Sequence, residues 1–334
     1  MLSIRAASGL GLDAGDDEFV RAAAQAFAAA DATVAPSGAL EALGWWQLLE
    51  DLSAVESRTA VFALFRAQGR ALGSSVALGG LMAQPYLDAL GTGPGSVVAT
   101  VPRLSPHRGA VAVLVGEPDG TPLLVDRPGS GVSVVGAEEV VLTPVDVPGR
   151  LVLHEVGLDP ARWQPSITDA GAGAARRRST FLGRVAVALE ILGAAEAAVG
   201  LAIGHAEVRE QFGQPIARFQ AVRHLLAWAV TDCAAVERVA MEAVTLDEAL
   251  PHSWGDVTKA LAGRNGRRAC ERALQVLGAV GFTADHAHHH FHSRVLALDA
   301  LAGTSATLTR ELGALQRAQP EDGGTITSAL LRER

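Results

Sequence analysis

Five residues in the second half of the sequence have side chains suited to holding a dinucleotide. Arg209 offers a planar fork of donors to a pyrophosphate, and Phe212 offers a ring face to an adenine. Gln275 supplies both a donor and an acceptor, while Gly278 lets a backbone come close to a cofactor. Thr304, at an expected helix start, can donate to an anion beside free backbone N–H groups. Together these side chains have the chemistry that contacts to such a cofactor would require.

Three of these positions also have an ordinary structural interpretation. Arg209 could pair with Glu207 or Glu210, and Phe212 could belong to a hydrophobic core. Gln275 could only cap a helix end. The sequence leaves both sets of alternatives open.

The sequence divides into three regions of different composition, and their folding positions these residues. Residues 14–90 are rich in Ala and Leu at helical spacing, whereas residues 95–163 contain short Val-rich runs separated by Gly, Pro and Asp. From residue 177 the chain is again helical. The expected helices there are 181–207, 211–250 with an early interruption at Pro215, 253–278 and 305–316. This order predicts an α+β protein with an N-terminal helical domain (1–92), a small, reduced β domain (93–165) and a C-terminal four-helix bundle (177–334).

Composition excludes several function classes. Hydrophobic residues make up 49% of the 334 residues and aromatic residues only 4%, so small aliphatic side chains must fill the core. The formal net charge of −8 argues against a broad nucleic-acid surface. The apolar stretch 185–203 contains Glu190 and Glu196, which favours a buried bundle helix with interhelix ion pairs over a membrane span.

The cysteine and N-terminal patterns indicate a reducing compartment. Cys233 and Cys270 lie in helical patterns and form no CxxC motif, so no disulfide framework is expected. The first residues lack the basic start and apolar core of a signal peptide. We therefore expect a cytoplasmic protein.

Three motifs in the last region resemble the acyl-CoA dehydrogenase family. They are Arg-Glu-Gln-Phe-Gly-Gln-Pro-Ile at 209–216 followed by Phe-Gln-Ala-Val at 219–222, Gln-Val-Leu-Gly-Ala-Val-Gly-Phe-Thr at 275–283, and Gly-Thr-Ser at 303–305. The family carries RxxFGxxIxxxQ, QxxGGxGY and EGTS in this order. The resemblance implies that Arg209, Phe212, Gln275, Gly278 and Thr304 contact FAD, the first four reaching a flavin seated mainly in the neighbouring subunit.

The sequence departs from the family where proton abstraction takes place. Most members place a catalytic Glu before Gly-Thr-Ser, where this chain has Ala302, and a minority place it on the long helix, where this chain has Gly183. Neither usual base is present, so no catalytic residue is assigned. Arg184 matches a family arginine near the active site, and its default role is structural. The TExxxGSD and Trp-Ile-Thr/Ser stretches that hold the flavin ring and the thioester are also missing.

These losses resemble those of the non-catalytic subunit type in bacterial α2β2 acyl-CoA dehydrogenases. The resemblance implies an FAD shared with a catalytic paralogue, acyl-CoA bound through that partner, and an electron-transfer flavoprotein as acceptor. Bulky or steroid side-chain thioesters are substrates of several such enzymes. Two alternatives stay open: a homomeric flavoprotein with different chemistry, such as nitroalkane oxidation or flavin-dependent hydroxylation, and a non-enzymatic helical scaffold.

Four further features receive structural interpretations. The five histidines between His286 and His292 are expected in a solvated or interface loop rather than in a metal site, and Asp285 is a weak candidate for a substitute base. Trp45-Trp46 is expected in a core or interface. The basic run at 176–178 is expected in a solvated linker or helix start.

Overall fold

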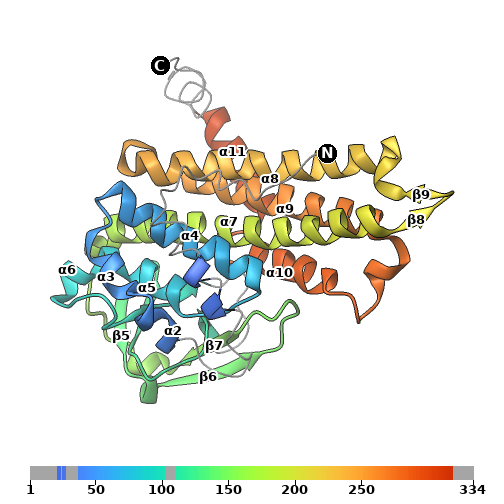
Figure 1. Cartoon of the computed structure of the whole chain (residues 1–334). Coiled ribbons are helices and arrows are strands. Elements are labelled where there is room, and N and C mark those ends of the chain that lie inside the picture. The colour runs from blue at the N-terminus through green and yellow to red at the C-terminus, as the bar shows by residue number, and fades with distance from the viewer. Residues whose placement is uncertain (1–20, 24, 28–36, 103–109, 319–334) are drawn as a thin grey trace.

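A single long helix, α7 (Asp169–Val208), is the axis on which the other elements pack. The computed structural model describes residues 21–23, 25–27, 37–102 and 110–318. In Figure 1 the N-terminal helices and the small β region lie on one side of α7, and the long C-terminal helices lie on the other. This arrangement confirms the predicted α+β fold class of N-terminal helices, middle β region and C-terminal helical bundle.

The N-terminal helices pack a core of aromatic and aliphatic side chains. They are α2 (Ser37–Ala42), α3 (Trp45–Leu48), α4 (Val55–Ala71), α5 (Ala77–Ala83) and α6 (Leu87–Leu90). Trp45 is fully buried and meets Phe65 edge to face at a centroid distance of 5.9 Å, which confirms the expectation of a core position. Phe19, Ala23 and Phe27 follow one another at a helical spacing of four residues; Ala23 and Phe27 are buried, and Phe19 lies outside the described residues.

The β region consists of two small sheets. One has the order β1-β4-β5, and the other has the order β2-β3-β7-β6 and is antiparallel throughout. The strands are β1 (Val98–Ala99), β2 (Val101–Pro102), β3 (Ala110–Val115), β4 (Leu123–Arg127), β5 (Gly131–Val135), β6 (Val140–Val145) and β7 (Leu153–Leu158). Alternating burial along β7 places one face of its sheet against the core.

The bundle helices after α7 are α8 (Gln220–Leu246), α9 (Ser253–Leu277), α10 (His288–Ala300) and α11 (Ser305–Ala318). Helix α7 starts after Thr168, whose hydroxyl accepts from the Gly171 N–H at 3.2 Å. Its apolar middle passes a length and hydropathy test for a membrane span, but 72% of that window is buried inside the protein. The expectation of a buried bundle helix for 185–203 is therefore confirmed.

Two glycines allow α4 and α7 to cross at backbone contact. A Cβ built on Gly69 would lie 2.0 Å from the carbonyl oxygen of Glu190, and one built on Gly193 would lie 2.0 Å from that of Arg66. Such spacing leaves no room for a methyl group. The small residues that the composition indicated are therefore required at this crossing.

The two glutamates of α7 form the interhelix ion pairs that the sequence predicted. Glu196 accepts from Arg66 and Arg70 of α4, with Arg66 Nε at 2.9 Å and Arg70 Nη2 at 2.7 Å. Glu190, almost fully buried, pairs with the fully buried Arg294 of α10 and accepts from Gln68 at 3.0 Å. Arg294 also donates to backbone carbonyls at Gly73 and Gly149, so it joins the N-terminal helices, the β region and the bundle.

Three local expectations were wrong. The basic run at 176–178 lies inside α7, which begins at Asp169 rather than near residue 181, and Arg176 and Arg178 are engaged in ion pairs. The helix expected from residue 211 begins at Gln220, because residues 209–215 form a hairpin. The histidine segment expected as a loop forms most of the first half of α10, and His288 is buried.

Candidate functional site

The hairpin between α7 and α8 lies at one end of the bundle (Figure 1). Strands β8 (Glu210–Gln211) and β9 (Gln214–Pro215) pair around Phe212 and Gly213, whose φ angles are 54° and 77°. Two positive φ angles in a two-residue hairpin loop favour Gly and Asn rather than an aromatic residue. Phe212 nevertheless occupies the first position and is 93% exposed, so the core alternative is wrong.

Phe212 meets the ring of Phe219 edge to face at a centroid distance of 6.1 Å, whereas the side chains of Arg209 and Gln275 have no partner among the described residues. Arg209 is exposed, and no described carboxylate pairs with it, so the alternative of a pair with Glu207 or Glu210 finds no support. Gln275 is exposed on the last turn of α9, and no described hydrogen bond engages its side chain. Gly278 ends that helix at φ 64° and ψ −143°, a conformation essentially restricted to glycine.

Thr304 has a different role and a different place. Its hydroxyl accepts from the Thr307 N–H at 3.1 Å and so caps α11. It lies in the turn that α7 contacts through Arg184, and Arg184 precedes Arg209 by 25 residues, about 38 Å along the helix at 1.5 Å per residue. The structure therefore does not bring the five predicted cofactor residues together within one chain.

A cavity of about 260 Å³ lies where the β region, α7 and the Gly-Thr-Ser turn meet. Ala302 and Gly303 line it, as do Tyr86, Asp126, Arg176 and Arg184. Arg184 Nε donates to the Ala302 carbonyl at 2.9 Å, and its other end pairs with Asp256. Burial raises the pKa of Asp256, against the opposing effect of Arg184. Arg184 thus holds the turn in place and also lines the cavity.

The second family base position is filled by a neighbouring side chain. A Cβ built on Gly183 would lie 2.7 Å from Sδ of Met82 and 3.0 Å from its Cγ. Met82 itself lines the cavity. A carboxylate side chain at position 183 therefore requires Met82 to move.

Two carboxylates that the sequence reasoning missed line this cavity. Asp126 of β4 forms a bidentate pair with Arg176, at 2.6 and 2.7 Å, and accepts from the Tyr86 hydroxyl at 3.2 Å. Burial, followed by the charge of Asp126, raises the pKa of Tyr86. A carboxylate held by two guanidinium donors is a poor proton acceptor. Glu311 of α11 is exposed at the rim, and among described residues it has no hydrogen-bond or ion-pair partner.

The signal for Asp126 was too weak to find in the sequence. Asp126 ends an ordinary Val- and Leu-rich strand, and its partner Arg176 lies 50 residues later. Only the packing of β4 against α7 brings them together.

The histidine segment lies at the other end of the bundle, near the hairpin. His288 Nε2 is 2.9 Å from the Cys270 carbonyl oxygen, and burial lowers its pKa. Among the described residues no group of three or more His, Cys, Asp or Glu side chains could hold a metal ion. Asp285 is exposed in this region and does not line the cavity, so it is no substitute base there.

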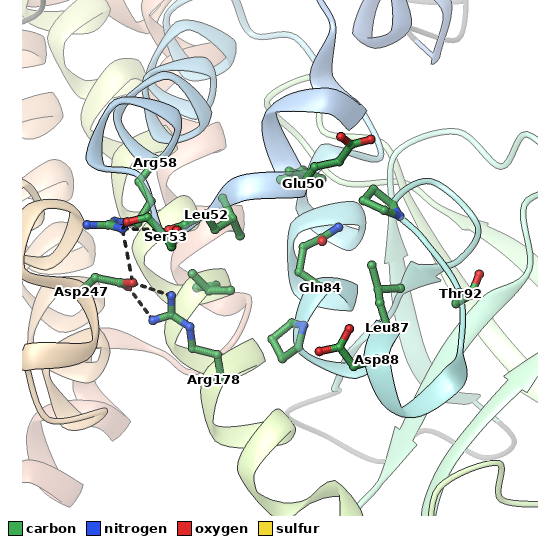
Figure 2. Close-up of a pocket in the computed structure, with 14 residues that line it drawn as sticks. Glu50, Leu52, Ser53, Arg58, Gln84, Leu87, Asp88, Thr92, Arg178 and Asp247 are labelled. Carbon is green, nitrogen blue, oxygen red and sulfur yellow. Dashed lines mark hydrogen bonds and ion pairs between the residues drawn. The ribbon is translucent and has the colours of Figure 1, made fainter.

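A larger recess of about 610 Å³ opens beside the N-terminal helices (Figure 2). Arg178 forms a bidentate contact with Asp247, at 2.6 and 2.8 Å, and Arg58 approaches the same carboxylate at 3.8 Å. Arg58 also donates to four backbone carbonyls, two of them at the end of α8. The guanidinium donors of Arg58 and Arg178 are engaged by acceptors within the protein, so the cluster links α4, α7 and the end of α8.

Comparison with known proteins decides the family. Residues 169–315 match the family model described as acyl-CoA dehydrogenase, C-terminal domain. The chain is a member of the acyl-CoA dehydrogenase family. Acyl-CoA dehydrogenase FadE34 from Mycobacterium tuberculosis is 28% identical over 65% of this chain and 30% of its own length. The chain therefore spans less than a third of that relative.

Two solved structures share the fold over nearly the whole chain. The ChsE4–ChsE5 complex from Mycobacterium tuberculosis aligns with a TM-score of 0.73 and 17% identity, covering 93% of this chain and 99% of the other. A variant of the steroid ACAD Tcur3481–Tcur3483 aligns with a TM-score of 0.71 and 19% identity, covering 92% and 98%. At these identities the likeness concerns the fold alone.

Proposed function

We propose that this chain is the accessory, base-lacking subunit of a heteromeric FAD-dependent acyl-CoA dehydrogenase. The proposal rests on the residues that occupy the usual base positions in the cavity beside the Gly-Thr-Ser turn. One base position is Ala302, and the other, Gly183, lies under Met82. Asp126, the buried carboxylate of the cavity, is neutralised by Arg176. Proton abstraction from the acyl thioester therefore falls to the partner subunit.

The cavity also fits a flavin poorly, whereas the opposite end of the bundle fits one well. Ligand sites usually have about 300–1,000 Å³, and 260 Å³ is small for a flavin ring and a thioester together. Arg209 and Phe212 are exposed and have the chemistry for a pyrophosphate and an adenine, with Gln275 and Gly278 on the same end. FAD, when bound, accepts the hydride equivalent of the dehydrogenation. This chain would hold only the adenine side of an FAD that the partner seats.

The comparisons support a heteromeric assembly. Both structural neighbours named above carry two-component names, and one of them is called a steroid ACAD. We accordingly propose a catalytic paralogue as partner, α,β-dehydrogenation of an acyl-CoA as the joint reaction, and a bulky or steroid side-chain thioester as substrate. An electron-transfer flavoprotein is the proposed acceptor.

The test is co-expression with a family member of the same genome that carries Glu before Gly-Thr-Ser. The expected product is a yellow complex with about one FAD per two chains that oxidises acyl-CoA. Arg209→Ala and Phe212→Ala in this chain should lower the flavin content, while Ala302→Glu should leave turnover unchanged. A colourless or inactive wild-type complex contradicts the proposal.

One observation favours the homomeric alternative. Glu311 lines the rim of the cavity without a described partner, so it is available to act as a base. If the isolated chain binds flavin and turns over a substrate, and Glu311→Gln abolishes that turnover, this second function replaces the first. A partner complex that never contains flavin would instead indicate a scaffold.

A further inference from the structure

Arg209 offers a single charged donor group to a diphosphate, in which both phosphates are anionic. Its planar guanidinium suits one of these phosphates. Gln275 brings a neutral amide to the same end of the bundle, and Gly278 brings no side chain. A further donor beside Arg209 would serve the second phosphate.

Two histidines lie next to Arg209. His205 is one helical turn earlier on α7, and its carbonyl accepts from the Arg209 N–H at 2.9 Å, so the two side chains share one face. His286 lies between the short helix η7 (Gly278–Phe282) and α10, in a segment at the same end as the β8–β9 hairpin (Figure 1). Burial, followed by the charges of Arg209 and His286, lowers the pKa of His205. The three side chains therefore lie within reach of one another's charges.

The hydrogen bonds of His286 decide which of its ring nitrogens can face a ligand. Nδ1 accepts from the His288 N–H at 3.2 Å. A ring nitrogen that accepts carries no proton, so the neutral ring carries its proton on Nε2. Nε2 is the nitrogen farther from the backbone, and no described hydrogen bond engages it. His286 therefore presents one free N–H donor in addition to the nitrogen that holds its own segment.

The segment that carries His286 is fixed by its own hydrogen bonds. The His286 N–H donates to the Thr283 carbonyl at 3.2 Å, and Nδ1 of His289 lies 2.7 Å from the His286 carbonyl oxygen. A donor on a fixed backbone loses little conformational entropy when a ligand binds. The same bonds also allow a purely structural role, in which His286 serves only as the acceptor for the His288 N–H at the start of α10.

We propose that His286 is a further binding residue for FAD, and that its Nε2–H donates to the phosphate that Arg209 does not bind. This inference rests on the proposed accessory function and specifies how this chain holds the diphosphate. Exposed carboxylates at this end, Glu207, Glu210 and Asp285, repel an anion, so binding depends on donors that face the phosphates directly. A hydrogen bond to a charged phosphate is stronger than one between neutral groups.

The test titrates FAD into the flavin-free complex of this chain with the co-expressed family member that carries Glu before Gly-Thr-Ser. His286→Asn keeps an acceptor for the His288 N–H, because Asn side chains accept from the N–H two residues on, but it lacks the outer donor. His286→Gln keeps a donor at about the distance of Nε2 but loses that acceptor. We expect His286→Asn to raise the dissociation constant of FAD about tenfold, and His286→Gln to raise it by less than about threefold.

The matched control is His290→Asn, in the same run of histidines. Burial, followed by the charges of His289 and Arg150, lowers the pKa of His290, so its ring lies near the β region and not near Arg209. This variant should leave the dissociation constant of FAD within about twofold of wild type. ADP, which contains the diphosphate, should bind the His286→Asn complex more weakly than wild type, whereas adenosine, which has no phosphate, should bind both complexes equally.

The outcomes separate the role of His286 from the accessory function. If His286→Asn binds FAD as tightly as wild type, or if only His286→Gln loses affinity, His286 is merely a structural acceptor, while the accessory function survives. If the wild-type complex takes up no FAD, both proposals fail. An equal loss of affinity for ADP and adenosine in His286→Asn would overturn the contact to the diphosphate, because it would show a general disturbance of the site.

Discussion

A single methyl group placed at two glycines of α7 should have opposite effects on stability. Gly193 faces α4, where a new Cβ would lie 2.0 Å from the Arg66 carbonyl oxygen, although ordinary contact begins near 3.4 Å. Gly200 is exposed on the same helix, and a Cβ there meets nothing within 4 Å. The substitution of Gly by Ala therefore adds a steric clash at position 193, whereas at position 200 it only increases the helix propensity of the chain.

The size of each change in stability depends on the atoms that the new Cβ would meet. Gly193→Ala forces the backbones of α4 and α7 apart by more than about 1 Å, and overpacking of this kind costs about 1–3 kcal/mol or more. Because backbone atoms cannot rotate away, we expect a net loss of about 2–3 kcal/mol in the free energy of unfolding and a midpoint about 3–4 °C lower. Gly200→Ala should gain about 0.5–1 kcal/mol in the free energy of unfolding and raise the midpoint by about 1 °C.

Thermal unfolding followed by far-UV circular dichroism measures both shifts. Gly69→Ala, whose Cβ would meet the Glu190 carbonyl oxygen at 2.0 Å, should reproduce the loss from the α4 side of the same crossing. If Gly193→Ala proves as stable as Gly200→Ala, the close crossing of α4 and α7 is refuted.

Three further predictions concern the core, a titrating lysine and the hairpin. Arg294→Met leaves Glu190 buried without its partner and should cost about 3–5 kcal/mol in chemical denaturation, most of which the double variant with Glu190→Met should recover. Burial lowers the pKa of Lys259 from 10.5 to about 8, so the folded chain releases this proton before the unfolded chain does. Its contribution to the free energy of unfolding therefore increases as the pH rises from 8 towards 10.5. The urea midpoints of wild type and Lys259→Gln should diverge over that range. A difference between the two midpoints that stays constant with pH contradicts this prediction. Phe212→Asn should stabilise the isolated chain by about 1 kcal/mol, since Asn tolerates a positive φ, and an unchanged or lower thermal midpoint would argue against strain at the hairpin.

The sequence predicted the elements whose signals are local and periodic. The apolar run of α7, with Glu190 and Glu196 interrupting it, correctly indicated a buried helix with ion pairs to arginines. Helix α10 could not be recognised from the histidine run, because these residues show no helical spacing of apolar side chains. The segment 209–215 forms a hairpin where the sequence analysis expects a helix to begin at residue 211, although Gly213 and Pro215 favour a turn.

The contacts of the cavity could not be predicted in this way. Asp126 meets Arg176 across 50 residues, and Met82 reaches Gly183 from a separate helix. Neither contact leaves a trace in local spacing, because each depends on how the β region and α5 settle against α7. The missing base at Ala302 was visible from the sequence, whereas the occupied space at Gly183 required the structure.

Met82 above Gly183 also bears on how this chain can change over generations. A mutation that reintroduced an acidic residue at position 183 would meet the sulfur and Cγ of Met82 before it could serve any chemistry. Trimming Met82 first would open a void among packed helices and weaken the fold. If the proposed accessory function holds, restoring a base at position 183 therefore takes a second change, at position 82, and not a single substitution.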